Sequence, residues 1–307
     1  MLDEFIEFLK KESIIFETPE SEKNFHEAAE DITNYFYSFL SAFDDGRNRF
    51  IKLEQVSTKT KLGYAFPIEC KYRSINNDDK ICNFSANIYL EKLDIPIDKI
   101  TYDDLSFKCV LYSQSFGGDI HIKCLSLQNA ILRKDIENIY KRRASIVHEI
   151  SHILFKDELV KKGKPNPTKW AKSDGFNDDL ESNGYLNSIL DWLDNEIVQD
   201  LKNNNPKVLF KNENDIIEYL KHKNILLPHE EHKNIVQSNQ NREFFNDAFA
   251  HMTQQKYQKI VTKLFKHLKH IFDIKKENRA TYWLMKNKLQ EQNLNGIVSL
   301  ICKLNEQ

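Results

Sequence analysis

Hydrophobic positions in the first 43 residues recur every three or four residues, which is the spacing of an amphipathic helix. Residues 1–12 and residues 21–43 both show this pattern, and Ser21 suits the N-cap of the second segment. The apolar side of the second segment is rich in aromatic residues, as expected of a helix packed in a core. Asp44-Asp45-Gly46 then predicts the end of that helix.

From about residue 50 to residue 126 the hydrophobic period changes towards two, which predicts β-strands. Short polar turns separate these segments, and this arrangement favours a mostly antiparallel sheet. The predicted strands are Leu62–Tyr72, Ile81–Leu93, Leu105–Gln114 and Gly118–Leu127.

The helical period returns after the strands. We predict a helical lead-in at 129–142 and a polar loop at 163–182. The predicted helices are 145–155, 184–201, 213–222, 240–274 and 278–303. The fold class predicted is therefore α+β, with the sheet in an N-terminal region (1–135) and a mainly helical region at 136–307.

Composition narrows the class of protein. The chain has 307 residues, is 40% hydrophobic and 29% charged, and carries a net charge of −2. These values suit a globular protein and argue against a surface that attracts nucleic acid. Its acidic start and the lack of an 18-residue apolar run predict neither a secretory signal nor a membrane span, so we expect a cytoplasmic protein or one delivered into a target cell without a signal peptide. Five cysteines without a Cys-x-x-Cys pair indicate a reducing compartment and no cysteine metal site.

The segment Ser145–Phe155 carries the most specific chemistry in the chain. His148 and His152 are four residues apart, so on a helix both can bind one metal ion. Glu149 is then placed to take a proton from metal-bound water. Their neighbours form an apolar stripe that predicts a buried helix: Val147, Ile150, Ser151 and Leu154.

His148-Glu149-x-x-His152 on an apolar helix resembles the zincin metallopeptidases. The resemblance covers about a dozen residues. It implies Zn²⁺, a protein or peptide substrate, and a sheet packed beside the motif helix. In zincins a strand at the sheet edge borders the cleft, and Gly117–Lys123 resembles that strand by its nearness to the motif. The alternative is an ordinary strand after a Gly-Gly turn, and His121 within it is expected to be a surface histidine.

A hydrolytic zinc site needs a third protein ligand. Asn195-Glu196-x-x-x-Asp200 resembles the Asn-Glu-x-x-x-Asp signature of thermolysin-like gluzincins. This resemblance implies that Glu196 binds zinc and that Asp200 accepts a hydrogen bond from the first histidine ligand. A solvated acidic helix face would look the same in sequence, and Asp194 and Asp191 remain alternative ligands.

A second stretch, Arg242–Phe249, resembles the Glu-Phe-Phe-x-Glu-Ala-Phe segment of lethal-factor-like toxins. By that resemblance Glu243 would bind zinc and Asp247 would support a ligand histidine. The separation from His152 is about twice what that family shows, and no Tyr precedes Glu243 by a turn or two. The sequence leaves the choice between Glu196 and Glu243 open.

Other polar features favour simpler interpretations. His229 and His232 have a spacing that suits a metal, but they follow Leu227-Pro228 and predict an exposed turn. His267 and His270 lie on a lysine-rich helix and are predicted to be solvated. The basic face at 256–276 could contact nucleic acid, but a solvated outer helix face is the preferred interpretation.

Together these features predict a zinc-dependent endopeptidase. By analogy at the level of the motif, its substrate would be a host or phage protein inside the cell. The alternative is a regulatory or binding protein that keeps a metallopeptidase scaffold without hydrolysing a substrate. The oxyanion donor, for which Tyr185 is a candidate, the substrate and the oligomeric state do not follow from the sequence.

Overall fold

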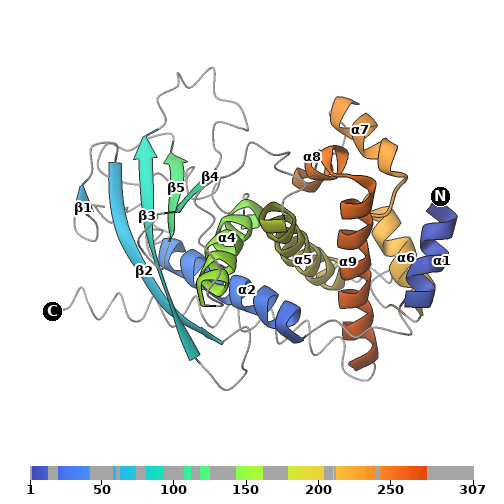
Figure 1. Ribbon diagram of the computed structural model, residues 1–307, viewed down its shortest axis with the longest axis horizontal. Coiled ribbons are helices and arrows are strands. Elements are labelled where there is room, and N and C mark those ends of the chain that lie inside the picture. The colour runs from blue at the N-terminus through green and yellow to red at the C-terminus, as the bar shows by residue number, and fades with distance from the viewer. Residues whose placement is uncertain are drawn as a thin grey trace. The chain divides into compact units, whose positions relative to one another are not determined.

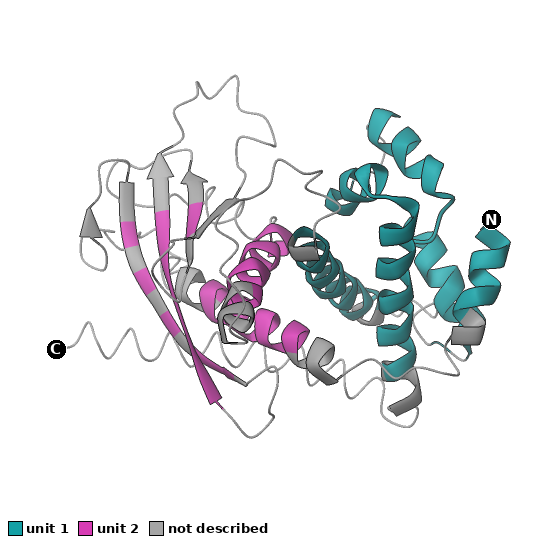
Figure 2. Ribbon diagram, viewed as in Figure 1, with its two compact units in different colours: residues 1–23, 170–288 teal, residues 24–169, 289–307 magenta. Residues whose placement is uncertain are grey.

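The computed structural model divides the chain into two compact units, coloured separately in Figure 2. One unit contains residues 1–23 and 170–288, and the other contains residues 24–169 and 289–307. We call them the helical unit and the sheet unit after the elements described in each. The structure describes residues 2–12, 20–41, 58–59, 63–73, 81–92, 107–111, 118–124, 143–161, 179–203, 210, 212–238 and 243–274.

The sheet unit holds a five-stranded sheet with the strand order β1-β2-β3-β5-β4 (Figure 1). Neighbouring strands pair antiparallel, except that β3 and β5 are parallel. Within the described sheet, β4 is therefore an edge strand and β5 an interior one. The bounds are β1 Thr58–Lys59, β2 Gly63–Arg73, β3 Ile81–Lys92, β4 Phe107–Leu111 and β5 Gly118–Cys124.

The interior position of β5 differs from the edge position with which the sequence Gly117–Lys123 was compared. Ile120 lies opposite Ile88 of β3 on one side and opposite Cys109 of β4 on the other. A strand paired on both sides has no open row of backbone groups to offer a peptide. Among the described strands next to the motif helix, β4 takes the edge position instead.

The strands follow the period-two pattern of their side chains. In β3, alternate residues face the core and the opposite side of the sheet, as the pleat of a strand requires. The buried set is Phe84, Ala86 and Ile88, and the exposed set is Asn83, Ser85 and Asn87.

Helix α4 (Arg143–Lys161) contains the histidine motif and contacts both β4 and β5. It also contacts α2 (Glu20–Ser41) at both ends. Phe155 packs edge-on against Phe25, with ring centroids 6.4 Å apart. Arg143 donates a hydrogen bond of 2.8 Å to Asn34 Oδ1 and lies 5.3 Å from the Tyr37 ring centroid. The position of α4 is therefore fixed by the sheet and by α2 together.

The helical unit is organised around α9 (Gln254–Ile274), which contacts α1, α5 and α6. Four apolar side chains of α9 are buried, namely Ile260, Leu264, Phe265 and Leu268. They join one apolar core with residues of the other helices. The other bounds are α1 Leu2–Glu12, α5 Asp179–Lys202, α6 Glu213–His222, α7 His229–Ser238 and α8 Phe244–His251.

The predicted helix 240–274 is two helices, because the chain is extended at Met252 (φ −69°, ψ 154°). Thr253 begins the second of them: its hydroxyl accepts a hydrogen bond of 3.3 Å from the Lys256 amide. Threonine is a good N-cap residue, so a new helix can start there without glycine or proline. The prediction missed this break because it relied on the uninterrupted apolar pattern.

The predicted mixture of helices and a sheet is confirmed, with most described residues in helices. The unit bounds differ from the predicted division at 135/136. Helix α4 packs against the sheet and belongs with it, whereas α1 contributes Phe5, Ile6 and Leu9 to the helical core. The predicted segments 129–142 and 278–303 lie outside the described residues, as do residues 163–178 of the predicted loop 163–182. Residues 179–182 of that loop belong to α5 instead. Within the part of the chain that is described, none of the helices has the length and apolar character of a membrane span.

Candidate metal centre

Helix α4 brings His148 and His152 together, as their spacing predicts. Their ring centroids are 4.4 Å apart and the rings are nearly perpendicular, at 84°. A ring nitrogen of one lies within 4.8 Å of a ring nitrogen of the other. Two nitrogens bound to one zinc ion at ~2.0–2.1 Å would be about 3.3 Å apart, so small side-chain rotations would suffice. Two imidazoles in this arrangement fit a zinc ion.

The surroundings of the two histidines differ. The predicted apolar stripe of α4 is buried, and His152 is 2% exposed. His148 and Glu149 are only partly buried, so this part of α4 has access to solvent. Ser151 donates a hydrogen bond of 2.7 Å to the Val147 carbonyl, which satisfies the hydroxyl inside the helix. Because Glu149 is only partly buried, water can reach this acid, to which the motif assigns proton transfer.

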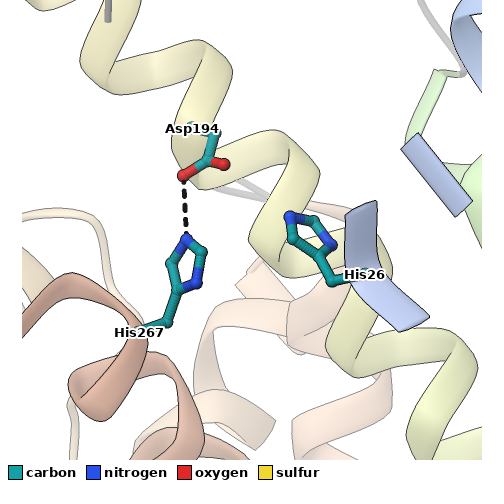
Figure 3. Close-up of side chains that lie close together, drawn as sticks. All are labelled: His26, Asp194 and His267. Carbon is teal, nitrogen blue, oxygen red and sulfur yellow. Dashed lines mark hydrogen bonds and ion pairs between the residues drawn. The ribbon is translucent and has the colours of Figure 1, made fainter. Parts of the chain in front are cut away.

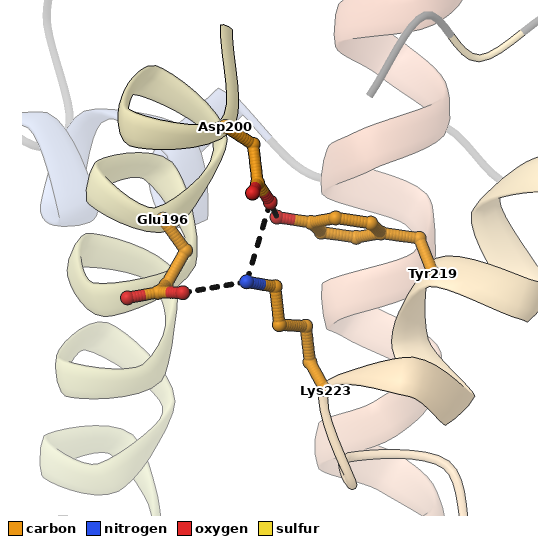
Figure 4. A network of polar contacts seen from close by, with 4 residues as sticks. All are labelled: Glu196, Asp200, Tyr219 and Lys223. Atoms are coloured by element: carbon orange, nitrogen blue, oxygen red, sulfur yellow. Dashed lines mark hydrogen bonds and ion pairs between the residues drawn. The ribbon is translucent and has the colours of Figure 1, made fainter. Parts of the chain in front are cut away.

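In the helical unit, Glu196 and Asp200 both contact Lys223 (Figure 4). Lys223 Nζ lies 2.5 Å from Glu196 Oε2 and 3.2 Å from Asp200 Oδ2. The Tyr219 hydroxyl donates to the same Asp200 oxygen at 3.0 Å. Burial lowers the pKa of Lys223, but its hydrogen bonds and charge interactions with the two acids outweigh this and raise the pKa overall. Burial, followed by the Asp200 charge, raises the pKa of Tyr219.

The rival ligand Glu243 belongs to the same group of charges. It stands just before α8, at the N-cap position, and its side chain does not cap that helix. Burial and the nearby Glu196 carboxylate raise the pKa of Glu243, whereas Lys223 opposes this shift. The charge of Glu196, one of the two acids between which the sequence could not choose, therefore acts on the other, Glu243. Asp247, the predicted partner of Glu243, accepts a hydrogen bond from His251 through its backbone carbonyl at 2.7 Å.

The alternative ligands on α5 lie on a different side of that helix. Asp191 is five residues before Glu196, which corresponds to about 140° around the helix axis. Asp191 accepts a 3.2 Å hydrogen bond from the Asn195 amide. Asp194 Oδ1 lies 3.3 Å from His267 Nε2 of α9 (Figure 3). An orientation of α5 that aims Glu196 at a metal would therefore turn Asp191 and Asp194 away from it.

Two histidines that were expected to be solvated are buried or nearly so. His232 is fully buried, and its Nδ1 lies 3.2 Å from Asn246 Oδ1. The His267 side chain is 17% exposed and faces Asp194. His267 had a signal in sequence, because it stands between Phe265 and Leu268 on the apolar side of its helix.

His121, expected at the surface, is partly buried and stacks on Tyr89 of the neighbouring strand. The ring centroids are 4.6 Å apart and the ring planes differ by 7°. The two residues are direct partners in the pairing of β3 with β5, which explains the stacking.

The predicted site residues form two groups in the structure. His148, Glu149 and His152 share α4 in the sheet unit, whereas Glu196 and Asp200 contact Lys223 in the helical unit, and the charge of Lys223 acts on Glu243. The identity of the third ligand stays a prediction.

Comparisons of the chain with protein-family models, with curated proteins and with solved structures gave no match.

Proposed function

We propose that the chain is a zinc-dependent endopeptidase that cleaves a protein substrate. The observation that carries this proposal is the pairing of His148 and His152 on α4, with the partly exposed Glu149 between them in sequence. Two nearby imidazoles and an adjacent carboxylate on a rigidly packed helix are the protein groups that metal-assisted hydrolysis needs.

Glu149 is the general base of the proposed reaction. Zinc, when bound, supplies Lewis-acid activation of a water molecule and of the substrate carbonyl. The Glu149 carboxylate accepts the proton that the attacking water gives up, and then donates it to the leaving amine. His148 and His152 would hold the metal through their ring nitrogens.

The edge strand β4 supports a peptide substrate. It contacts α4, and within the described sheet one of its sides has no strand partner. An extended substrate segment can add to such an edge through main-chain hydrogen bonds. Our proposal therefore includes a zincin-like arrangement, in which an edge strand beside the motif helix binds the substrate.

We assign Glu196 as the third ligand, with Glu243 as the alternative. Both are acids of the helical unit, and the Glu196 carboxylate contributes to the raised pKa of Glu243. Glu181, a half-buried acid near the start of α5, should be included in any substitution series. A true ligand is the acid whose conversion to the amide releases zinc without unfolding the chain.

The first test measures zinc content and peptide cleavage in the wild type and in Glu149→Gln. We expect about one zinc per chain in both proteins. Cleavage by Glu149→Gln should be at least ~100-fold slower, because a positioned base commonly contributes 10²–10⁴-fold. His148→Ala and His152→Ala should lose both zinc and activity.

Different failures would point to different conclusions. A wild-type protein without affinity for zinc would refute the proposal. Zinc bound through both histidines, together with no cleavage of a proteome-wide set of peptides, would favour the non-hydrolytic scaffold instead. Comparing protein termini in cells that express the wild type or Glu149→Gln would identify the substrate class.

A further inference from the structure

Strand β2 extends well beyond its short neighbour β1 (Figure 1). The residues of β1 pair with Tyr64 and Ala65, whereas β2 continues along β3 as far as Arg73. Among the described residues, the stretch 66–73 therefore has a strand on one side and none on the other. An open strand edge is a place where another chain can add through backbone hydrogen bonds.

Pro67 indicates which backbone groups face the open side of β2. It lies within the ladder, opposite Asn87 of β3, and it has no amide hydrogen to donate. A proline inside a paired strand has its nitrogen turned away from the partner strand. Because backbone groups alternate in direction along a strand, those of Glu69 and Lys71 face the open side as well.

The side chains of Glu69 and Lys71 carry opposite charges and are exposed. They lie two residues apart, so they are on the same face of the sheet. If two copies of β2 pair antiparallel about residue 70, residues at equal distances before and after the centre lie opposite each other. Glu69 of each copy is then opposite Lys71 of the other, and opposite charges at such positions attract.

This register also satisfies the backbone. Glu69 of one copy and Lys71 of the other form a hydrogen-bonded pair, in which each amide donates to the carbonyl of its partner. Pro67 lies opposite Arg73, so the Pro67 carbonyl can accept from the Arg73 amide. A shift of the register by two residues either way places Glu69 opposite Glu69 or Lys71 opposite Lys71, and like charges directly opposite are destabilising. The charges therefore favour pairing about residue 70 over the neighbouring registers.

We propose that the open edge of β2 binds a second copy of this chain, antiparallel and centred on residue 70. A two-fold interface must be complementary to itself, and a strand whose charge changes sign across its own centre meets this requirement. The paired stretch is short, so we expect a weak dimer with a dissociation constant of roughly 1–100 µM. Strand β4 lies at the other end of the described sheet and stays open in this dimer.

The experiment is sedimentation velocity over a series of protein concentrations, with charge-reversal variants. Glu69→Lys and Lys71→Glu should each weaken dimerisation at least about tenfold, because either change places like charges opposite each other twice across the interface. An equal mixture of the two variants should recover the wild-type affinity, since every lysine then faces a glutamate of the other variant. Lys233→Glu, at an exposed position on α7, is the matched control and should leave the dissociation constant unchanged.

Circular dichroism must show that each variant remains folded. If a charge reversal does not fold, Glu69→Gln and Lys71→Gln replace the pair, and each should weaken dimerisation about threefold. A wild type that stays monomeric at about 0.5 mM would overturn the proposal. So would a dimer that neither reversal weakens, because its interface would lie elsewhere, and so would a mixture of the two reversals that fails to associate. Zinc binding and peptide cleavage are measured separately, so none of these outcomes bears on the proposed function.

Discussion

At the scale of single residues, His232 and His148 contrast in what surrounds their imidazole rings. His148 is partly exposed next to a second histidine. His232 is fully buried, and its ring packs edge-on against Phe249 and Tyr257 with centroids 5.1 Å from each. Burial lowers the pKa of His232 to about 4, although its hydrogen bond to Asn246 opposes the shift. His148 therefore suits metal binding, whereas His232 is a neutral part of the core.

The pKa of His232 predicts a loss of stability in acid. Its folded-state pKa of about 4 lies below the ordinary 6.5, so the unfolded chain binds the proton more readily. The free energy of unfolding should fall as the pH drops from about 6.5 to about 4, by roughly 3 kcal/mol in total. Urea unfolding at pH 7, 5.5 and 4 would measure this fall.

His232→Gln removes the titrating group, so its unfolding free energy should depend less on pH over the same range. The exposed His251, substituted in the same way, serves as the control and should keep the wild-type profile. An equal fall in stability for wild type and His232→Gln would show that His232 is not responsible.

At the scale of elements, periodicity predicted most of what the structure describes. The helix 213–222 coincides with α6, and the strand predicted from Ile81 coincides with β3 to within a residue at its end. Two features depend on distant contacts and could not be predicted. The interior place of β5 depends on pairing with β3 and β4. The contact of Glu196 with Lys223 joins residues 27 positions apart, and local acid spacing carries no information about such a partner.

Helix α6 offers a test of an element that positions Lys223. The Asn212 side chain accepts hydrogen bonds from the amides of Asn214 and Asp215, and Asp215 Oδ2 accepts one from the Asn212 amide. Removing this capping box by Asn212→Ala should cost about 1 kcal/mol of unfolding free energy. Thermal or urea unfolding would measure it. Asn214→Ala, at an exposed site inside the helix, should change stability by less than ~0.5 kcal/mol.

At the scale of the whole molecule, His148 and His152 belong to the sheet unit, and Glu196 and Glu243 belong to the helical unit. Binding of zinc to ligands that come together only in the folded chain adds to its stability. The sequence does not predict this division well. Helix α4 packs against the strands, but its sequence pattern resembles the start of the helical region. The predicted boundary at 135/136 therefore separated elements that pack together.

Zinc should raise the thermal stability of the protein. At a free concentration 100 times the dissociation constant, the gain would be ~2.7 kcal/mol, or roughly 5–10 °C in the midpoint. Differential scanning calorimetry with zinc and after removal of metal by EDTA would measure the shift. His148→Ala should show little shift on the same additions, and an equal shift in this variant would mean that zinc binds elsewhere.

If a peptide substrate binds along β4, as proposed, the edge position of β4 limits what that substrate can look like. A polypeptide that joins the sheet there must be fully extended over several residues, since each added hydrogen bond requires strand geometry. Helices and tightly folded hairpins would have to unfold locally first, at a free-energy cost that slows their cleavage. Under the proposed function, the cleaved bonds would then lie in linkers, exposed loops and unstructured tails of the substrate.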